Sequence, residues 1–293
     1  MLIQRIDILC NIILRIPEEQ VRYIVDHIRD FYGEFRRFKR DKQGNKRRNK
    51  PKYVALNGEY WSRVINPPKQ DLKLIQKRIN AYLVENVPFP EFAFGGIKGR
   101  DNIQNARVHK GQKYVFQTDL KDFFPSVSNK MVYAMFVEKG FSPDVASLLT
   151  KLTTYEGHLP QGAPTSTTIA NHVFAPAGQE LQSIALREGL RFTTFVDDVT
   201  LSSQRDFKTV VPAIITIIEK HGFRISHGKT SYRSGFTDIT GVKMLNNSMA
   251  PTDELKKRIN AEVDKSSLRF KGLLNYAKRI KKVSSWHYTK ADS

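Results

Sequence analysis

A pair of adjacent aspartates inside an alternating segment is the feature that most limits how this chain can fold. The run Arg191-Phe-Thr-Thr-Phe-Val-Asp-Asp-Val-Thr-Leu-Ser-Ser203 alternates its side chains on both sides of Asp197 and Asp198. This pattern predicts a hairpin whose tight turn carries the two carboxylates. Aspartate is common in turns for local reasons, so turn chemistry is one interpretation. The other is that a divalent cation or an arginine relieves the repulsion between the two acids.

Chain length and composition are those of a globular protein that can hold an active site. The 293 residues are 40% hydrophobic and 26% charged, which allows a large core. The charge is unbalanced, because 48 Lys and Arg residues face 29 Asp and Glu residues, a formal net charge of +19. The expected partner is therefore a polyanion bound through its phosphates, with nucleic acid ahead of a membrane surface.

The same sequence favours a cytoplasmic location. No apolar run reaches the length of a membrane-spanning helix, and the segment Met1-Leu-Ile-Gln-Arg5 lacks the pattern of a signal peptide. The single cysteine, Cys10, excludes an internal disulfide and a cysteine-rich zinc site. We therefore expect a cytoplasmic protein with no membrane partner.

Segments with strand and helix periodicity are interleaved along the chain, which predicts an α+β fold. Apolar spacing predicts helices over Glu18–Phe38, Asp71–Leu83, Asn129–Lys139, Pro143–Thr153, Ser166 to about Arg187, Phe207–Ile218 and from Asp253 onward. Besides the hairpin, we expect a strand pair in Tyr53–Pro67 and strands at Lys113–Asp119, Arg224–Ser226, Ser231–Arg233 and Ile239–Leu245. The loop Val87–Gly99 holds Phe89, Phe92 and Phe94, which either stack on bases or pack beneath the loop.

Two basic segments are candidates for contact with a phosphate backbone. The run from Arg36 to Lys50, which includes Arg47 and Arg48, has nine basic residues in fifteen and little that can enter a core. It is either a solvated loop or a nucleic-acid contact, and the net charge favours the contact. Eleven Lys and Arg residues between Asp253 and Ser293 give the C-terminal helices a similar character.

A third carboxylate, that of Asp119, ends a predicted strand and can join the pair in the turn. If the strands are adjacent, three carboxylates can share two Mg²⁺ ions about 4 Å apart and leave the other metal positions to water and phosphate. One ion then lowers the pKa of an attacking hydroxyl, and the other stabilises a pyrophosphate leaving group. Nucleotidyl transfer is therefore the predicted chemistry.

Four short segments in order resemble the motifs of reverse transcriptases. Gln117-Thr-Asp-Leu-Lys-Asp-Phe-Phe-Pro-Ser126, Leu159-Pro-Gln-Gly-Ala-Pro-Thr-Ser166, Phe195-Val-Asp-Asp198 and His227-Gly-Lys-Thr230 are similar to motifs A, B, C and D. Asn105-Ala-Arg-Val-His109 and Ile239-Thr-Gly241 resemble two elements of the retron branch. From about Tyr53 to its C-terminal helices, the chain resembles a retron-type bacterial reverse transcriptase.

The resemblance implies a right-hand polymerase fold with fingers, a palm and a helical thumb. The acidic hairpin would lie on the antiparallel sheet of the palm. The expected parts are an N-terminal helical and basic segment at 1–50, fingers at 51–112, a palm at 113–245 with finger helices inserted around 129–160, and a thumb at 246–293.

The resemblance also implies catalytic roles. Asp119, Asp197 and Asp198 would be the ligands of two Mg²⁺ ions. Lys229 would protonate the departing pyrophosphate, with an ordinary surface lysine as the alternative. Motif C departs from the usual Tyr-Ala-Asp-Asp, because Phe195 lacks the tyrosine hydroxyl and Val196 is β-branched.

Four further residues are implied to bind the dNTP substrate. Arg63 would hold the triphosphate through charge-assisted hydrogen bonds. Gln161 and Gly162 would line the nucleotide pocket, where the missing side chain of glycine permits close backbone approach. Phe124 would lie under the sugar and exclude a 2′-hydroxyl, whereas its neighbour Phe123 is expected in the core.

The expected RNA partner is a structured non-coding RNA. Asn105 and His109, together with Arg47 and Arg48, would belong to the surface that recognises this RNA. The alternative for His109 is a structural role with hydrogen bonds inside the protein.

The resemblance implies reverse transcription of that RNA into branched, RNA-linked single-stranded DNA (msDNA), in a retron anti-phage defence system with an effector protein. One alternative is an abortive-infection or other non-retron bacterial reverse transcriptase. Another is a non-catalytic RNA-binding protein. The three aspartates argue against the last, because unpaired acids beside a phosphate-binding groove weaken binding.

Overall fold

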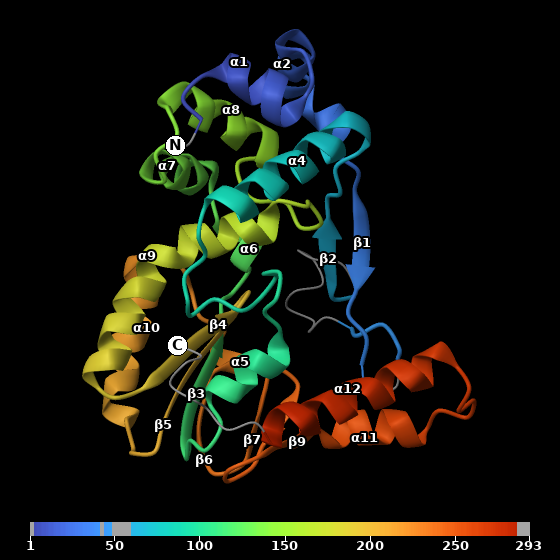
Figure 1. The fold of residues 1–293 in the computed structure, drawn as a ribbon, viewed down its shortest axis with the longest axis vertical. Coiled ribbons are helices and arrows are strands. Elements are labelled where there is room, and N and C mark those ends of the chain that lie inside the picture. Colours follow the sequence, from blue (N-terminus) through green and yellow to red (C-terminus); the bar gives the residue numbers. More distant parts are fainter. Residues whose placement is uncertain (1–2, 42–43, 49–59, 286–293) are drawn as a thin grey trace. The chain divides into compact units, whose positions relative to one another are not determined.

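The computed structural model describes residues 3–41, 44–48 and 60–285 (Figure 1). The chain forms two compact units, one made of Met1–Pro88 and Phe124–Val173 and the other of Phe89–Phe123 and Phe174–Ser293. Each unit therefore combines two separated stretches of sequence. The division into an N-terminal segment, fingers, palm and thumb, with boundaries at residues 50, 112 and 245, stays a prediction.

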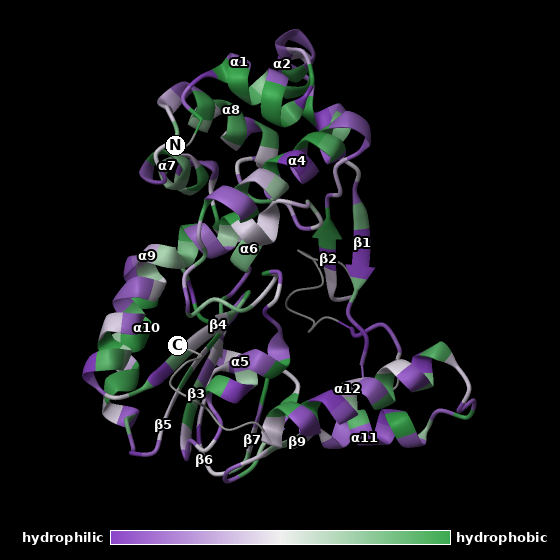
Figure 2. Cartoon of the chain, in the orientation of Figure 1, coloured by the Kyte–Doolittle hydropathy of each residue, from purple (hydrophilic) through white to green (hydrophobic). Residues whose placement is uncertain are grey.

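The first unit is mostly helical. Its elements are α1 (Ile6–Ile8), η1 (Leu9–Leu14), α2 (Glu18–Asp26), η2 (Ile28–Phe31), β1 (Phe35–Phe38), β2 (Ser62–Ile65), α4 (Gln70–Asn86), α7 (Asn129–Glu138) and α8 (Pro143–Thr153). Helix α4 buries one face, on which Leu72, Ile75, Ile79 and Leu83 are at most 1% exposed. Figure 2 shows hydrophobic and hydrophilic residues along the helices of both units, as amphipathic packing requires.

A buried glutamine ties α4 to its neighbours inside this unit. Gln76 is fully buried, and its Nε2 donates hydrogen bonds to the Tyr32 hydroxyl at 2.7 Å and the Leu152 carbonyl at 2.8 Å. Burying an amide costs free energy unless it is hydrogen-bonded, so these bonds specify one packing arrangement.

The predicted helix Glu18–Phe38 is wrong beyond Asp26, where only a short 3-10 turn at Ile28–Phe31 follows. The α-helix ends at Asp26, and Phe35–Phe38 is instead a strand antiparallel to β2, with Phe35 opposite Ile65. The predicted strand pair within Tyr53–Pro67 also differs, because β2 pairs with β1, while residues 53–59 lie outside the described residues. Local periodicity does not reveal a strand whose hydrogen-bonding partner lies far along the chain.

The second unit is built on a four-stranded antiparallel sheet. Its strands are β4 (Arg191–Phe195), β5 (Asp198–Ser203), β3 (Tyr114–Asp119) and β6 (Ser231–Ser234), in that spatial order. A separate three-stranded sheet holds β7 (Thr237–Ile239), β8 (Val242–Met244) and β9 (Met249–Pro251). The hairpin and the strand ending at Asp119 are confirmed, but the turn is shifted by one residue from the predicted one, because Asp198 already begins β5 and only Asp197 of the acidic pair lies in the turn.

Two other predicted strands are wrong. The expected strand Ile239–Leu245 is interrupted by a turn at Thr240 and Gly241, whose φ angles are 44° and 80°. These left-handed conformations reverse the chain between β7 and β8. The expected strand Arg224–Ser226 is reduced to an isolated bridge between Leu120 and Ile225.

Helices complete the second unit and share a core with its sheets. They are α5 (Asn102–Val108), η3 (Lys208–Val210), α10 (Val211–Lys220), η4 (His227–Lys229), α11 (Asp253–Asn260) and α12 (Leu268–Ser285). Helices α6 (Phe123–Ser126) and α9 (Ser166–Arg187) contribute residues to both units. One hydrophobic cluster joins Ile103, Val115, Val242, Leu255 and Ile280.

Within the described residues, we find no helix that is both long enough and apolar enough to cross a bilayer.

Candidate active site

Strand pairing in the second unit brings together the three aspartates singled out in the sequence. Asp119 ends β3 directly opposite Asp198, the first residue of β5. Phe195 closes the other side of the hairpin by pairing with Asp198, so Val196 and Asp197 form the turn. The Leu120 amide donates to the Asp197 carbonyl at 2.8 Å, which ties the turn to the end of β3.

The turn places a β-branched residue in an unfavourable conformation. Val196 has a φ of 59°, in the left-handed region that a valine rarely occupies. The surrounding backbone must therefore hold it there. The departure of motif C from the usual sequence at Val196 therefore falls on a turn residue whose backbone is strained.

The loop that precedes α5 supports the turn from the side of β4. The Thr194 amide donates to the Phe92 carbonyl, and the Phe94 amide donates to the Thr194 carbonyl, both at 2.8 Å. The backbone then passes so close to the turn that a Cβ on Gly95 would lie 2.3 Å from the Val196 nitrogen. Only glycine fits at position 95 without displacing the turn.

Phe92 anchors the same loop in the core. Its side chain is 7% exposed, and its ring centroid lies 5.0 Å from that of Phe192. A Cβ on Gly178 of α9 would overlap the Phe92 ring, so the helix is open at that point to receive it. Of the two predicted roles for this aromatic residue, packing is the one that the structure shows.

The three carboxylates repel one another in a partly buried site. Burial, and after it the negative charges of Asp197 and Asp119, together raise the pKa of Asp198 to about 6. Lys229, on η4, opposes this shift and forms an ion pair with Asp119. The Ser226 hydroxyl also donates to Asp119 at 2.9 Å. Lys229 and Asp119, both predicted to be catalytic residues, therefore lie side by side.

The donor set fits a hard divalent cation, although its side chains do not form a closed shell. Carboxylate oxygens are the ligands that Mg²⁺ and Mn²⁺ prefer, and a cation would relieve the repulsion that raises the pKa of Asp198. Across the described residues, no group of three or more His, Cys, Asp or Glu side chains is already arranged as a metal site. Asp119 is instead paired with the Lys229 ammonium.

A cavity of about 480 Å³ opens beside these residues, within the second unit. Asp119, Asp198 and Lys229 line it on one side, and Asp238 and Lys243 of the β7–β8 hairpin line it on another. Its lining is mainly polar and charged in character, as expected for a site that receives phosphates and a cation.

The residues predicted to bind the dNTP lie in the first unit. Arg63 is on β2, and the Asn66 amide just beyond that strand donates to the Gln161 carbonyl at 2.8 Å. Gly162 has a φ of 104°, and a Cβ there would lie 2.8 Å from Ile65. The structure therefore brings the strand of Arg63 and the turn of Gln161 and Gly162 together.

The two neighbouring phenylalanines of α6 differ in burial. Phe123 is 3% exposed and packs against Phe174 and Phe223 of the second unit, with ring centroids 6.2 and 5.7 Å away. Phe124 is only partly buried. This contrast agrees with a core role for Phe123, and the steric role of Phe124 stays a prediction.

Arg47 and Arg48 lie on the surface. Both residues are exposed, and the main chain of Arg47 bonds to that of Lys39 at 2.8 Å and of Trp61 at 2.9 Å. Their side chains are therefore available to solvent, and their predicted contact with RNA stays a prediction.

Direct RNA contact by Asn105 and His109 does not fit the structure, because both residues are 1% exposed. Asn105 Nδ2 donates to the Thr240 hydroxyl at 3.2 Å. The His109 ring bonds to Ser202 at 2.6 Å and Thr193 at 2.7 Å, and burial lowers its pKa to about 3. The structural alternative for His109 is the one observed.

Sequence reasoning missed two residues that shape the site. Gly95 supports the acidic turn, and its only signal is a glycine pair after the aromatic residues of the loop. Ser226 appeared in the sequence analysis only as the end of an expected strand, yet its amide also donates to the Asp119 carbonyl at 2.7 Å. Both depend on contacts between segments far apart in the sequence.

A protein-family model matches most of the chain. The model is described as reverse transcriptase (RNA-dependent DNA polymerase) and matches residues 50–273. The chain is 35% identical over 175 residues to the retron Se72 reverse transcriptase of Salmonella heidelberg (strain 579083-10), covering 58% of this chain and 46% of that protein. It is 31% identical over 206 residues to the retron Ec86 reverse transcriptase of Escherichia coli, covering 69% and 64%. The chain thus spans 46% and 64% of the length of these relatives.

A solved structure supports the same fold. Telomerase from Candida albicans, in complex with a fragment of telomeric RNA, aligns with a TM-score of 0.51 at 11% identity, covering 93% of this chain and 62% of that one. At this identity the likeness concerns the fold alone. The α+β fold with a sheet carrying the acidic hairpin is accordingly a reverse transcriptase polymerase fold, as predicted.

We predict that Gly95→Ala destabilises the protein, because the added Cβ must push against the Val196 backbone. Overpacking of this kind costs about 1–3 kcal/mol. Gly272→Ala is the matched control, because no atom lies within 4 Å of a Cβ at that helical position. Urea unfolding should show the loss for Gly95→Ala alone, and equal stabilities of the two variants would disprove the packing at the turn.

We also predict that His109 makes stability depend on pH. Its pKa is about 3 in the folded protein and higher when unfolded, so stability is complete above about pH 6.5 and falls as pH drops toward 3. The slope from this group approaches about 1.4 kcal/mol per pH unit. His109→Gln should flatten the dependence of unfolding free energy on pH between 6.5 and 5. Exposed His27→Gln is the control, and an unchanged slope in His109→Gln would refute the prediction.

Proposed function

Because the chain belongs to the reverse transcriptase (RNA-dependent DNA polymerase) family, we propose that it is an RNA-directed DNA polymerase that copies RNA into DNA. The observation that carries the proposal is the β3–β5 register, which sets Asp119 opposite Asp198 beside the turn that holds Asp197. Three carboxylates at one end of a sheet, beside a polar cavity, suit transfer of a nucleotide to a primer hydroxyl.

Reverse transcriptases depend on divalent metal ions, and we propose that two Mg²⁺ ions bind here. Asp119, Asp197 and Asp198 would hold them. Bound there, the ions would lower the pKa of the attacking hydroxyl and offset the charge of the pyrophosphate. The repulsion that raises the pKa of Asp198 supports this assignment, because Lys229 offsets it only in part.

Lys229 is the proposed proton donor to the pyrophosphate. Its side chain is half exposed and forms an ion pair with Asp119, so it can exchange that carboxylate for a phosphate group. A lysine ammonium carries protons that a departing phosphate oxygen can accept. The resemblance of His227-Gly-Lys-Thr230 to motif D supports this role.

We assign dNTP binding to residues of the first unit. Arg63 would grip the triphosphate, and the turn at Gln161 and Gly162 would lie against the nucleotide. The hydrogen bond from Asn66 to the Gln161 carbonyl supports a joint role for the strand of Arg63 and this turn. Phe124 would lie under the sugar and exclude a 2′-hydroxyl.

The proposed partner is a structured non-coding RNA that serves as template and primer. The product would be branched, RNA-linked single-stranded DNA (msDNA), formed in the cytoplasm and used with an effector protein in anti-phage defence. The similarity to retron reverse transcriptases supports an RNA partner, and the net charge of +19 supports binding to its phosphates. Arg47 and Arg48, both exposed, are proposed RNA contacts.

We predict that Asp197→Asn abolishes DNA synthesis while leaving RNA binding intact, because it removes a metal-binding charge. Purified protein, its genomically adjacent RNA, dNTPs and Mg²⁺ should yield DNA covalently joined to RNA. Asp264→Asn, an exposed aspartate in the α11–α12 loop, is the matched control and should retain activity. DNA synthesis that survives Asp197→Asn would contradict the proposal, and synthesis without added RNA would point to a template-independent polymerase.

We predict that Phe124→Ala weakens discrimination against ribonucleotides, because it removes the ring under the sugar. A steric contact of this kind is worth about 1–3 kcal/mol, so the preference for dNTP over rNTP should fall about tenfold or more. The readout is single-nucleotide extension with dGTP against GTP. Tyr133→Ala, on the exposed side of α7, is the control. Unchanged discrimination in Phe124→Ala would remove this residue from the nucleotide site.

A further inference from the structure

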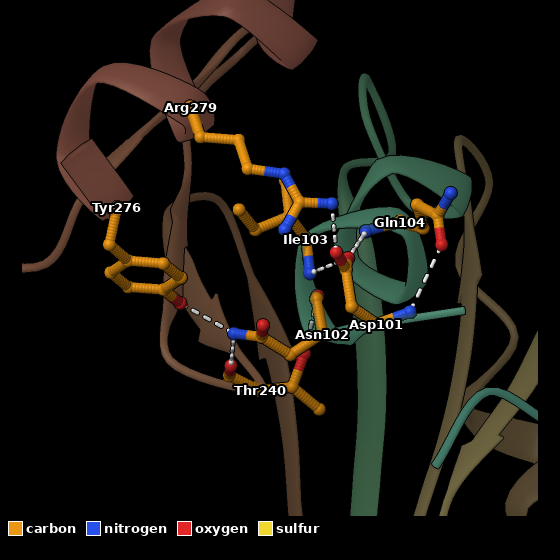
Figure 3. Close-up of polar contacts among 7 residues, drawn as sticks. All are labelled: Asp101, Asn102, Ile103, Gln104, Thr240, Tyr276 and Arg279. Carbon is orange, nitrogen blue, oxygen red and sulfur yellow. Dashed lines mark hydrogen bonds and ion pairs between the residues drawn. The ribbon is translucent and has the colours of Figure 1, made fainter. Parts of the chain in front are cut away.

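The residue that caps the first turn of α5, Asp101, also contacts α12 (Figure 3). The Asp101 carboxylate accepts hydrogen bonds from the amides of Ile103 and Gln104, both at 2.9 Å, and the Asp101 amide donates to Gln104 Oε1 at 3.0 Å. This is a complete capping box. Arg279 of α12 forms an ion pair with the same carboxylate. One side chain therefore caps α5 and fixes α12 to it.

Asn102, the next residue, bonds in two directions. Its Nδ2 donates to the Thr240 carbonyl at 2.8 Å and to the Tyr276 hydroxyl of α12 at 2.5 Å (Figure 3). The Thr240 hydroxyl donates in return to the Asn102 carbonyl at 3.0 Å. A single turn of helix thus bonds both to the β7–β8 turn and to α12.

These bonds hold a turn whose backbone conformation is strained. Thr240 is β-branched and has a φ of 44°, and Gly241 follows with a φ of 80°. A non-glycine residue in this region persists only where its surroundings determine it. The side chains of Asn102 and Asn105 both donate hydrogen bonds to Thr240, so α5 holds Thr240 in this conformation.

The β7–β8 hairpin also forms a wall of the cavity that contains Asp119. Asp238 and Lys243 line that cavity, and Gln117 Nε2, two residues before Asp119, donates to the Asp238 carbonyl at 3.2 Å. Beyond the turn, α12 exposes Lys271, Lys278 and Lys282 along its length. Their spacing places them on one side of the helix, where phosphates of a duplex can bind.

We propose that Asp101 and Asn102 are positioning residues whose bonds hold α12 and the β7–β8 hairpin in one fixed arrangement. We call this set of bonds the lock. A primer–template duplex held along α12 then reaches the cavity at Asp119 in a fixed position. The lock joins segments that resemble two separate sequence motifs, Asn105 to His109 and Ile239 to Gly241. It rests on the proposed polymerase function and concerns how the duplex is placed, while the chemical step stays with the aspartates.

Arg279→Gln tests the lock with little risk to folding, because its side chain is 55% exposed. Lys281→Gln, on the same helix and also exposed, changes the net charge equally and is the matched control. We expect Arg279→Gln to raise KM for a primer–template about threefold relative to the control and to shorten the products, because a partly exposed ion pair is lost. kcat at saturating duplex should be unchanged, and Arg279→Lys should restore the wild-type KM.

Hydrogen–deuterium exchange separates the lock from the polymerase function. Asn102→Ala should speed exchange of amides in the β7–β8 turn and in α12, relative to Lys281→Gln, whether or not the protein polymerises. Equal exchange in the two variants, or equal KM and product length for Arg279→Gln and Lys281→Gln, would overturn the lock. Loss of all synthesis in the wild-type protein would instead refute the proposed function and leave the exchange result to decide the lock.

Discussion

Mutual repulsion among three carboxylates is the physical constraint on which the rest of the second unit depends. The antiparallel register of β3 and β5 sets Asp119 opposite Asp198, and the turn between β4 and β5 adds Asp197. Such a cluster opposes folding until a cation arrives, so the backbone beneath it must be rigid. Four hydrogen-bonded strands provide that rigidity, and the close approach of Gly95 holds the strained Val196 in place.

A short helix extends this organisation to the parts of the unit that lie farther along the chain. Helix α5 contributes Ile103 to the core that also contains Val242 and Ile280, so it packs against the three-stranded sheet and α12 at once. The polar residues Asp101 and Asn102 at its start then form bonds that orient α12 and the β7–β8 turn. The two segments that resemble retron elements are therefore parts of one bonded structure, joined by Asn105 and Thr240. Asn105 and His109, whose residue types look suited to RNA recognition, are buried and form hydrogen bonds inside the protein instead.

The acidic hairpin was predictable because two-residue alternation on both sides of a polar turn has few other solutions. The pairing with Asp119 followed from its position at the end of an apolar strand, and helix α4 followed from its apolar spacing. Strand β1 was not predictable, because its partner β2 lies well beyond it in the sequence. The reversal at Thr240 and the need for glycine at position 95 depend on contacts that no local pattern records. Burial of His109 is likewise a property of the packed helix.

The central claim is that Asp119, Asp197 and Asp198 together bind the metal ions used in DNA synthesis. Anomalous scattering from crystals of the protein with a chain-terminated primer–template, a dNTP and Mn²⁺ tests it most directly. We expect Mn²⁺ within about 2.1 Å of oxygens from these carboxylates, with Lys229 displaced from Asp119 toward the triphosphate. Mn²⁺ bound only elsewhere, or a dNTP-bound complex in which Lys229 still pairs with Asp119 and no metal touches the aspartates, would contradict the claim.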